Sequence, residues 1–420
     1  MGKKSVNNMT WVKQKLGNIT EIVSGGTPSS SNPDFWIGGD VNWATLPDLS
    51  KKYLFNTQRK ITKFGLKNSS AKLLPINTII FSSRATIGEI SITKTETTTN
   101  QGSKNLICNP EKAVFEFIYY CLKYNVKRIQ ELASGATYKE INKNDLSNVE
   151  IDIPDLSDQK RIAGVLAVYD DLIDNNEKRI RILEEMAQML YTEWFVKFKF
   201  PGCEKVKMID SGTEYGMIPE GWEINKLRDV AGYVRGCSYS SDEIDDFIGE
   251  YYIVNLKSFN RGGGFRPDGA KYYTGDVNEN QLLSEDDIVV AVTDMTNDRA
   301  VIARPARIPE IRNKMTFSAD VVKIISNVLP NSFIYQLLSN YRFTETTKNK
   351  ANGANVLHLR PDSILEYKAL IPTKDLMTKF DVLCSKMAHE INKLISQTEI
   401  SVKTRDILIP QLVTGKRDVK

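Results

Sequence analysis

Apolar and polar positions along the chain follow two different periods. Short runs such as 77–82 and 287–292 are apolar, rich in β-branched residues and bounded by Gly, Pro, Asn and Ser clusters, which is typical of buried strands between turns. Each strand-rich stretch ends near a proline, Pro154 or Pro372, and a stretch with helical spacing follows it. This alternation predicts two globular domains, each followed by a long helix.

The stretch after Pro154 carries the clearest helical period, a 4-3 spacing of apolar positions that is typical of a coiled-coil seam. We expect this helix to begin with Ser157 as its N-cap, beside Asp158, and to end near Phe198. Asn176 interrupts the seam; it would fix the register inside a helix pair, or it would lie at a wet edge of the pair, and both interpretations are open. The seam positions are Ile162, Leu166, Tyr169, Ile173, Asn176, Ile180, Leu183, Ala187, Leu190 and Trp194.

The helix after Pro372 has a less regular seam, and we expect it to end by Pro410. A helix that leaves the second domain finds an apolar partner most simply by running back along the first helix. We therefore predict an antiparallel coiled coil with one domain at each end. The seam positions of the second helix are Phe380, Cys384, Met387, Ile391, Ile395, Thr398 and Val402.

The chain also repeats itself. Trp11 and Trp222 begin the same pattern of apolar and glycine positions, and Ile153-Pro154 matches Ile371-Pro372. We therefore predict an α+β fold in which two similar mixed α/β domains are related by a pseudo-two-fold axis. The predicted boundaries are 1–156 for the first domain, 157–200 for the first long helix, 201–221 for a turn-rich linker, 222–373 for the second domain and 374–420 for the second long helix with a C-terminal tail.

Composition restricts the class of function. Hydrophobic residues make up 41% and charged residues 26% of the chain, as in ordinary globular proteins. No apolar run approaches the about 20 residues that span a bilayer, and the first residues lack the apolar core of a secretion signal, so we expect a cytoplasmic protein. The net charge of +4 is compatible with nucleic-acid binding but does not decide for it.

Side-chain chemistry points away from a catalytic or metal centre. The five cysteines include no Cys-x-x-Cys pair, so we expect free thiols and no metal site. The sequence has no Gly-x-Gly-x-x-Gly turn, no P-loop and no Asn/Asp-Pro-Pro-aromatic segment of the kind that marks base methylation. We expect no catalytic residue and no cofactor bound by this chain, although its many carboxylates leave a carboxylate-only nuclease centre open.

Six sequence blocks, in this order, carry a family resemblance. Over nearly its whole length the chain resembles the specificity subunits of type I restriction-modification systems. The second domain departs from the pattern, because Arg235-Gly-Cys-Ser and 292–296 stand roughly where the first domain has its Ser-Gly-Gly-Thr-Pro and Ser-Ser-Arg-Ala blocks. The blocks that carry the resemblance are 24–29, 35–43, 82–88, 99–103, 133–141 and 153–162.

The resemblance implies a function. Each domain would be a target-recognition domain that reads one half of a split, asymmetric site in double-stranded DNA. The helices would set the unread gap between the half-sites, and their seam residues would also dock two modification (methyltransferase) subunits. Restriction subunits with translocase activity would join that core. The chain itself would be non-catalytic, with S-adenosylmethionine, ATP and Mg bound by the partner subunits.

Base readout requires donors and acceptors on loops, whereas Lys, Arg and backbone N–H groups position phosphates. In the first domain, Arg84 can pair with guanine or form a surface ion pair, and Asn100-Gln101 can pair with adenine or form a polar turn. The basic cluster around Tyr53 is a phosphate contact or a solvated face. The candidate DNA contacts of the first domain are Gly25, Gly26, Thr27, Lys51, Lys52, Tyr53, Arg59, Lys60, Ser82, Ser83, Arg84, Thr86, Asn100, Gln101, Tyr138 and Lys139.

The second domain offers weaker candidates. Asp294 can accept a hydrogen bond from cytosine, although a turn or cap role is the favoured interpretation. The glycines 262–264 lack the Gly-Lys-Ser/Thr of a Walker loop. The candidate contacts of this domain are Arg235, Tyr239, Lys257, Arg261, Arg266, Thr293, Asp294, Asn297 and Arg299.

Two alternative functions remain. One is a self-contained DNA methyltransferase or nuclease, for which the sequence shows no cofactor pocket. The other is a coiled-coil scaffold without DNA readout, which accounts for the heptads but not for the recognition-like blocks.

Overall fold

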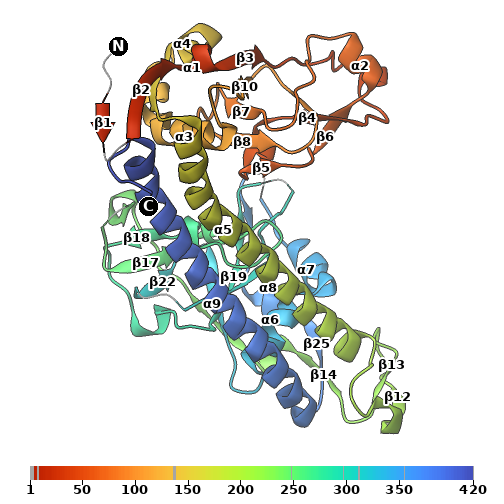
Figure 1. Ribbon diagram of the computed structural model, residues 1–420. Helices are drawn as coiled ribbons and strands as arrows, with labels where there is room; N and C mark the ends of the chain where they lie inside the picture. The colour runs from red at the N-terminus through yellow and green to blue at the C-terminus, as the bar shows by residue number, and fades with distance from the viewer. Residues whose placement is uncertain are drawn as a thin grey trace. The chain divides into compact units, whose positions relative to one another are not determined.

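The structure is a computed structural model that describes residues 4–6, 9–135, 139–246, 248–296, 298–310, 313–353 and 355–419. The chain divides into two compact units. The first unit comprises Met1–Asp174 and Glu399–Lys420, and the second comprises Asn175–Thr398. Two long helices, α5 (Leu156–Tyr191) and α9 (Lys374–Val413), contribute residues to both units (Figure 1). Among the described residues, no helix combines the length and the apolar character needed to cross a membrane.

The first unit contains a five-stranded sheet of order β3-β10-β7-β8-β5 and two three-stranded sheets, β6-β4-β9 and β1-β2-β11. Besides its α5 and α9 segments, its elements are β1 (Lys4–Val6), β2 (Met9–Lys15), α1 (Leu16–Ile19), β3 (Thr20–Ser24), β4 (Val41–Ala44), β5 (Tyr53–Leu54), β6 (Arg59–Ile61), α2 (Lys63–Lys67), β7 (Ile79–Ser82), β8 (Ile90–Thr93), β9 (Thr97–Thr99), β10 (Ser103–Cys108), α3 (Phe115–Glu131), α4 (Lys143–Asn148) and β11 (Glu150–Ile153).

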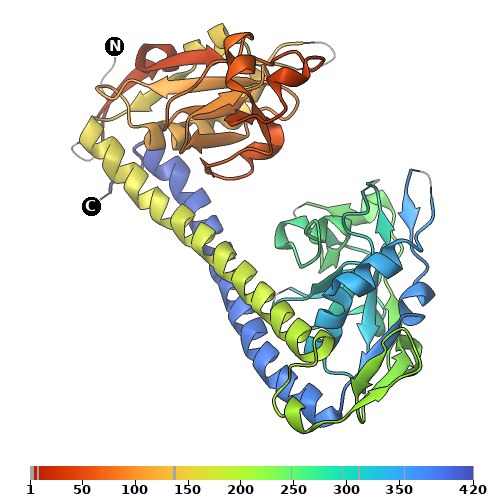
Figure 2. The same ribbon diagram turned by 90° about the vertical axis from the view of Figure 1, so that its right-hand side faces the viewer.

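The second unit contains two four-stranded sheets, β15-β23-β19-β21 and β16-β18-β17-β22, and three strand pairs, β12-β13, β14-β25 and β20-β24 (Figure 2). Its elements besides α5 and α9 are β12 (Met208–Asp210), β13 (Met217–Pro219), β14 (Glu223–Lys226), β15 (Gly232–Arg235), β16 (Ile244–Asp245), β17 (Tyr251–Val254), β18 (Lys271–Tyr273), β19 (Ile288–Ala291), β20 (Thr293–Asp294), β21 (Pro305–Arg307), β22 (Met315–Phe317), β23 (Val321–Ile325), α6 (Asn331–Ser339), α7 (Tyr341–Lys348), β24 (Leu357–His358), α8 (Asp362–Leu365) and β25 (Lys368–Ile371).

The two units share one topology. Strands β3-β10-β7-β8 of the first unit correspond in order and direction to β15-β23-β19-β21 of the second. In each unit a further strand is paired antiparallel to one neighbour and parallel to another: β4 with β6 and β9, and β17 with β18 and β22. Phe117 of α3 and Phe333 of α6, which match in the sequence repeat, are each fully buried in their own unit. The repeat in the sequence is therefore a repeat of the fold.

The α5 and α9 segments lie side by side within each unit in both views (Figure 1 and Figure 2). In the first unit, Asp170 of α5 pairs with Arg405 of α9 at 2.7 Å. In the second unit, Arg179 pairs with Glu390 at 2.8 Å, and the ring of Tyr191 lies 6.2 Å from that of Phe380. Residue numbers rise along α5 as they fall along α9, so the two segments are antiparallel within the second unit.

The C-terminal segment completes the first unit. Ile409, Leu412 and Val413 share its main apolar core with Ile162 and Leu166. Beyond α9, Gly415 lies against Trp11 so closely that a Cβ atom at this position would be 2.6 Å from the indole ring. The first unit is thus built from chain segments at both ends of the sequence.

The helix ends differ in detail from the sequence expectation. Asp155 rather than Ser157 caps α5, because its Oδ1 accepts the N–H of Asp158 at 2.9 Å. The α-helix ends at Tyr191, and a π-helical turn, Thr192–Val196, follows it. Pro410 lies inside α9 and does not end it. Burial of Leu412 and Val413 offsets the about 3 kcal/mol that an internal proline costs.

The predicted seam of α5 faces inward throughout, since each of its ten positions is buried or half-buried. Asn176 is only 1% exposed, which excludes the wet edge, and its Nδ2 makes no hydrogen bond with the described part of the chain. On α9 the 4-3 spacing continues through Leu394 and Ser401, which are buried. The predicted Ile395 and Val402 are half-buried neighbours of that line. At 394–395 two apolar residues are adjacent and the sequence does not tell which one faces inward, and at 401 the buried residue is polar.

A buried ionic cluster ties the globular part of the first unit to both helices. The carboxylate of Asp170 on α5 accepts hydrogen bonds from Tyr120 and Arg405 and lies 3.1 Å from Lys52 Nζ. The side chains of Lys52, Asp170 and Arg405 are 7%, 9% and 12% exposed. Burial by itself raises the pKa of Asp170, but Lys52, Tyr120 and Arg405 outweigh it and hold that pKa below its ordinary value.

Replacing Asp170 by Asn should destabilise the first unit by about 3–5 kcal/mol, because it removes the buried counter-charge of Lys52 and leaves Arg405 only its half-exposed partner Asp406. Urea denaturation of the full chain measures this as an earlier transition of that unit. The matched control is Asp174→Asn, which removes an exposed partner of Lys51 at 3.6 Å and should change stability by less than about 1 kcal/mol. Equal effects of the two substitutions would contradict the assignment.

Candidate nucleic-acid interface

The loop after β7 presents Arg84. Ser82 is buried; its Oγ donates to the carbonyl of Thr86 at 2.6 Å and accepts the N–H of Gly88 at 3.0 Å. Ala85 adopts a left-handed conformation with φ 61°, which costs energy for a residue with a side chain and is common at functional sites. Ser82 therefore shapes the loop as a structural residue, and the half-buried Arg84 is the side chain that the loop offers.

A second predicted segment lies directly beside this loop. The N–H of Ser83 donates to the carbonyl of Gly102 at 2.8 Å, and the N–H of Gly102 donates to Asn100 Oδ1 at 3.1 Å. Gln101 accepts a hydrogen bond from the hydroxyl of Thr27. The structure thus brings the predicted segments 25–27, 82–86 and 100–101 into one surface region, although they are far apart in the sequence.

Close backbone approach explains one glycine in each unit. A Cβ atom at Gly25 would lie 1.9 Å from the carbonyl oxygen of Asn100, and one at Gly236 would lie 2.2 Å from that of Ser318. Neither position can hold a side chain without moving backbone. Gly25 and Gly26 also donate their N–H groups to Ser103 and Thr99, so these groups are structural and not open to phosphate.

Sequence analysis missed two charged residues of this region. Lys104 on β10 is 5% exposed, and its Nζ lies 2.9 Å from Glu140 Oε1 and 3.2 Å from Ser83 Oγ. Glu140 in turn forms an isolated β-bridge with Arg84. Only the strand register, which the sequence does not reveal, places Lys104 under the Arg84 loop.

The basic cluster around Tyr53 is largely engaged within the protein. Lys52 is buried against Asp170, so it does not fit its predicted phosphate contact. Lys51 pairs with Asp174 at 3.6 Å but its side chain is exposed, so its phosphate contact stays a prediction. The Arg59 guanidinium stacks 4.1 Å from the centre of the Trp36 ring. Lys60 is half-buried on β6. The cluster thus serves mainly packing and internal ion pairs.

Three predicted contacts of the second unit, Asp294, Arg299 and Arg261, are engaged within the protein, and Asp294 is the most deeply buried of them. Asp294 is 1% exposed, and it accepts the N–H groups of Val301 and Ile302 at 2.8 and 3.1 Å and that of Thr296 at 2.8 Å. Burial raises its pKa, but these hydrogen bonds outweigh it and lower the pKa below the ordinary value. The turn role, not cytosine recognition, is therefore what the structure supports.

Arg299 and Arg261 are likewise engaged. Arg299 donates to the carbonyl of Lys348 at 3.3 Å and to Asn349 at 3.1 Å. Arg261 forms an ion pair with Asp298. In the two units together, the exposed candidates are Thr27, Lys51, Arg59, Thr86, Gln101, Lys139, Arg235, Tyr239, Lys257, Arg261 and Arg266. Tyr138 and Asn297 lie outside the described residues.

The strand registers relate the Arg84 region to a pocket of the second unit. Ser24 pairs with Lys104 in the first unit as Arg235 pairs with Val322 in the second. The N–H of Ile141 donates to the carbonyl of Ser83 just as that of Leu359 donates to Val292.

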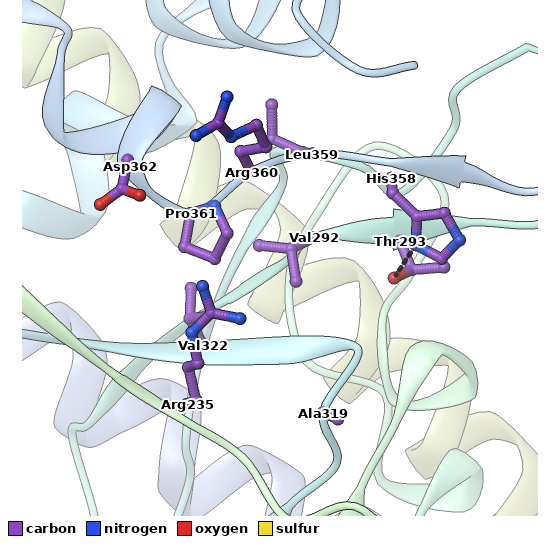
Figure 3. A pocket seen from close by; sticks show the side chains of 10 residues that line it. All are labelled: Arg235, Val292, Thr293, Ala319, Val322, His358, Leu359, Arg360, Pro361 and Asp362. Atoms are coloured by element: carbon purple, nitrogen blue, oxygen red, sulfur yellow. Dashed lines mark hydrogen bonds between the residues drawn. The ribbon is translucent and has the colours of Figure 1, made fainter. Parts of the chain in front are cut away.

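The same registers place two further pairs of residues in equivalent positions. Arg84 forms a β-bridge with Glu140, and Thr293 pairs with His358. His358, like Lys104, was missed by the sequence analysis, although it lies 218 residues after Glu140, the offset of the repeat at Ile153 and Ile371. Figure 3 shows this pocket, with His358 beside Thr293.

Among the described residues, no group of three or more His, Cys, Asp and Glu side chains is placed to hold a metal ion. All five cysteines, Cys108, Cys121, Cys203, Cys237 and Cys384, are free thiols.

Comparison with known proteins defines the class. Residues 8–185 match the family model described as the type I restriction modification DNA specificity domain. The chain is 29% identical over 425 residues to the MjaIX specificity subunit of Methanocaldococcus jannaschii, covering 98% of this chain and 94% of that protein. It is 28% identical over 199 residues to the EcoR124I/EcoR124II specificity subunit of Escherichia coli, covering 46% of this chain and 49% of that protein.

A solved structure supports the same fold. The crystal structure of a type I restriction-modification S subunit from M. genitalium superimposes with a TM-score of 0.56 at 15% identity, covering 97% of each chain. Over 98% of its length the chain thus resembles type I restriction-modification specificity subunits in sequence, and it shares their fold, in line with its sequence blocks. These relatives are named as specificity subunits, not as catalytic subunits.

Replacing Asp294 by Ala should destabilise the second unit by about 2 kcal/mol or more, because it leaves buried N–H groups without an acceptor. Thermal or urea unfolding measures the shift. Asp298→Ala, in the same loop but with an exposed ion pair, is the control and should cost less than about 1 kcal/mol. A stable Asp294→Ala variant with altered DNA preference would instead restore the base-contact interpretation.

Proposed function

We propose that this chain is the DNA-sequence-reading subunit of a type I restriction-modification complex and that each unit reads one half of a bipartite site in double-stranded DNA. The observation that carries the proposal is that one fold occurs twice with different side chains at equivalent surface positions. Two similar folds with different contact residues are what an asymmetric two-part target requires. The role is non-catalytic and is carried out in the cytoplasm, where the DNA lies.

The long helices supply the spacing in this proposal. The α5 and α9 segments pack along each other inside each unit, with the ion pairs Asp170–Arg405 and Arg179–Glu390. We take them to form one antiparallel coiled coil that separates two target-recognition domains and sets the unread gap. This arrangement relates the domains by the pseudo-two-fold axis that the sequence repeat predicts.

Partner subunits need a surface that helix pairing leaves open. The predicted seam residues are turned inward, so they serve pairing. A second apolar line on α5, Ile182, Met186 and Met189, is exposed and has the same 4-3 spacing. We assign this line to the docking of the modification subunits, which would bring S-adenosylmethionine, with restriction subunits adding ATP and Mg.

Arg84 is the proposed base contact of the first unit. Its guanidinium can make a bidentate contact to guanine, and Asn100 and Gln101 lie on the neighbouring loop as candidates for adenine. Arg84→Ala should therefore weaken or relax recognition of one base pair in one half-site by about 1–3 kcal/mol. Competition binding with single-base variants of the site measures the effect.

The control for this substitution is Arg128→Ala. Arg128 is exposed in the same unit, but its side chain donates to the carbonyl of Glu150 at 3.1 Å. Its removal takes away the same charge and should leave base preference unchanged. If Arg84→Ala and Arg128→Ala behave alike, Arg84 is not a reader.

The spacing role is tested by lengthening the helices. We would insert one heptad after Asn176 in α5 and one after Leu394 in α9, so that both insertions fall between the two ion pairs that join the helices. Seven helical residues add about 10 Å, which is about three base pairs at 3.4 Å each. Mapping methylated sites in cells should then show both half-sites unchanged and a longer gap. An unchanged gap would contradict the spacer role.

A further inference from the structure

The second unit has a pocket at the place where the first unit has an ion pair. At the equivalent positions of the first unit, Lys104 and Glu140 form an ion pair 2.9 Å long beneath the Arg84 loop. In the second unit these positions hold Val322, whose side chain is shorter than that of lysine, and His358, whose side chain is exposed. Loss of the ion pair leaves a hollow of about 330 Å³, which is large enough for a phosphate group with its adjoining sugar.

Cationic side chains reach this pocket from two sides. Arg235 comes from the end of β15, and Arg360 follows β24 on the opposite edge (Figure 3). Both arginines are exposed, and within the described part of the chain neither forms an ion pair. Arg235 has one aromatic neighbour, Tyr233, whose ring centre lies 5.8 Å from the guanidinium carbon.

The pocket also contains one carboxylate. Asp362 lies on the rim and accepts a hydrogen bond from the Tyr233 hydroxyl at 3.3 Å. Two guanidinium groups against one carboxylate leave the lining positive, and like charges around one hollow repel each other. An anion bound between them removes that repulsion, and the guanidinium fork fits phosphate oxygens in a bidentate manner.

Part of the lining between the charges is apolar. Val292, Val322 and Pro361 line the pocket between the two arginines. This combination suits a phosphodiester, whose oxygens face the arginines while its sugar carbons contact the apolar wall. Thr293 and His358 lie 3.4 Å apart within the lining, in hydrogen-bond distance of each other.

We infer that this pocket binds a backbone phosphate of DNA in the half-site contacted by the second unit, with Arg235 and Arg360 as the phosphate ligands. The inference rests on the proposed function and specifies one contact within it, which is to the DNA backbone and not to a base. The first unit uses the equivalent position for the internal Lys104–Glu140 ion pair and offers Arg84 from the loop above it. The second unit uses it for a positioning contact, which carries no sequence information of its own.

The test uses the full chain purified with its modification subunits, and two duplexes: one carries the site found by methylation mapping, and the other is a shuffled sequence of equal length. Arg360→Ala and Arg235→Ala should each weaken binding to both duplexes about tenfold, the cost of one charged hydrogen bond. The slope of log affinity against log salt should become shallower by about 0.9 for each phosphate that the variant no longer neutralises.

The control is Arg228→Ala in the same unit, since Arg228 already pairs with Glu366; it should change neither affinity nor slope. Arg360→Gln removes the same charge but keeps a polar side chain. A loss of binding shared by Arg360→Ala and Arg360→Gln reports the missing charge, whereas a loss confined to Arg360→Ala reports a folding defect.

Three outcomes would overturn one claim or the other. Loss of binding to the mapped site alone, with the shuffled duplex unaffected, would mean a base contact and would overturn the phosphate assignment. Unchanged binding by both pocket variants would overturn the pocket while leaving the proposed function intact. A wild-type complex that does not discriminate between the duplexes would overturn the proposed function itself.

Discussion

The carboxylate of Asp170 is the point on which the first unit depends. It lies under the globular part, on α5, and it binds Tyr120, Lys52 and Arg405 at once. A buried charge of this kind is costly unless every partner is in place. The globular part of the first unit therefore has one favourable position on the two helix segments. The cluster therefore fixes where the globular part of the first unit lies along its two helix segments, apart from any net stability that it contributes.

The repeated fold separates what is constant from what varies. The glycines at positions 25 and 236 are held by the same close backbone contact in both units, and the buried aromatic residues Phe117 and Phe333 fill equivalent core sites. On this constant frame the charges change position: Lys104 and Glu140 are replaced by Val322 and His358, and a serine is replaced by Arg235. A duplicated domain can thus acquire a second specificity without altering its core.

Much of the architecture could be predicted from the sequence, because periodicity and repetition report burial directly. The seam from Ile162 to Trp194 faces inward as expected. The site was harder to predict, because a polar residue type does not say whether the side chain is already engaged inside the protein. Lys52 and Asp294 look like surface contacts in the sequence, yet both are buried and fully engaged. Lys104 and His358 gain meaning only through strand register, which connects distant segments.

The division of the chain has a consequence for biosynthesis. The second unit is one continuous segment, Asn175–Thr398, whereas the first also needs Glu399–Lys420. During translation the second unit can therefore complete its core first. Ile162 and Leu166 of the first unit stay uncovered until Leu412 has been synthesised and packs against them. Over that interval the first unit exposes apolar surface. Its fold is complete only when Gly415 packs against Trp11. The half that is synthesised first is the half that matures last.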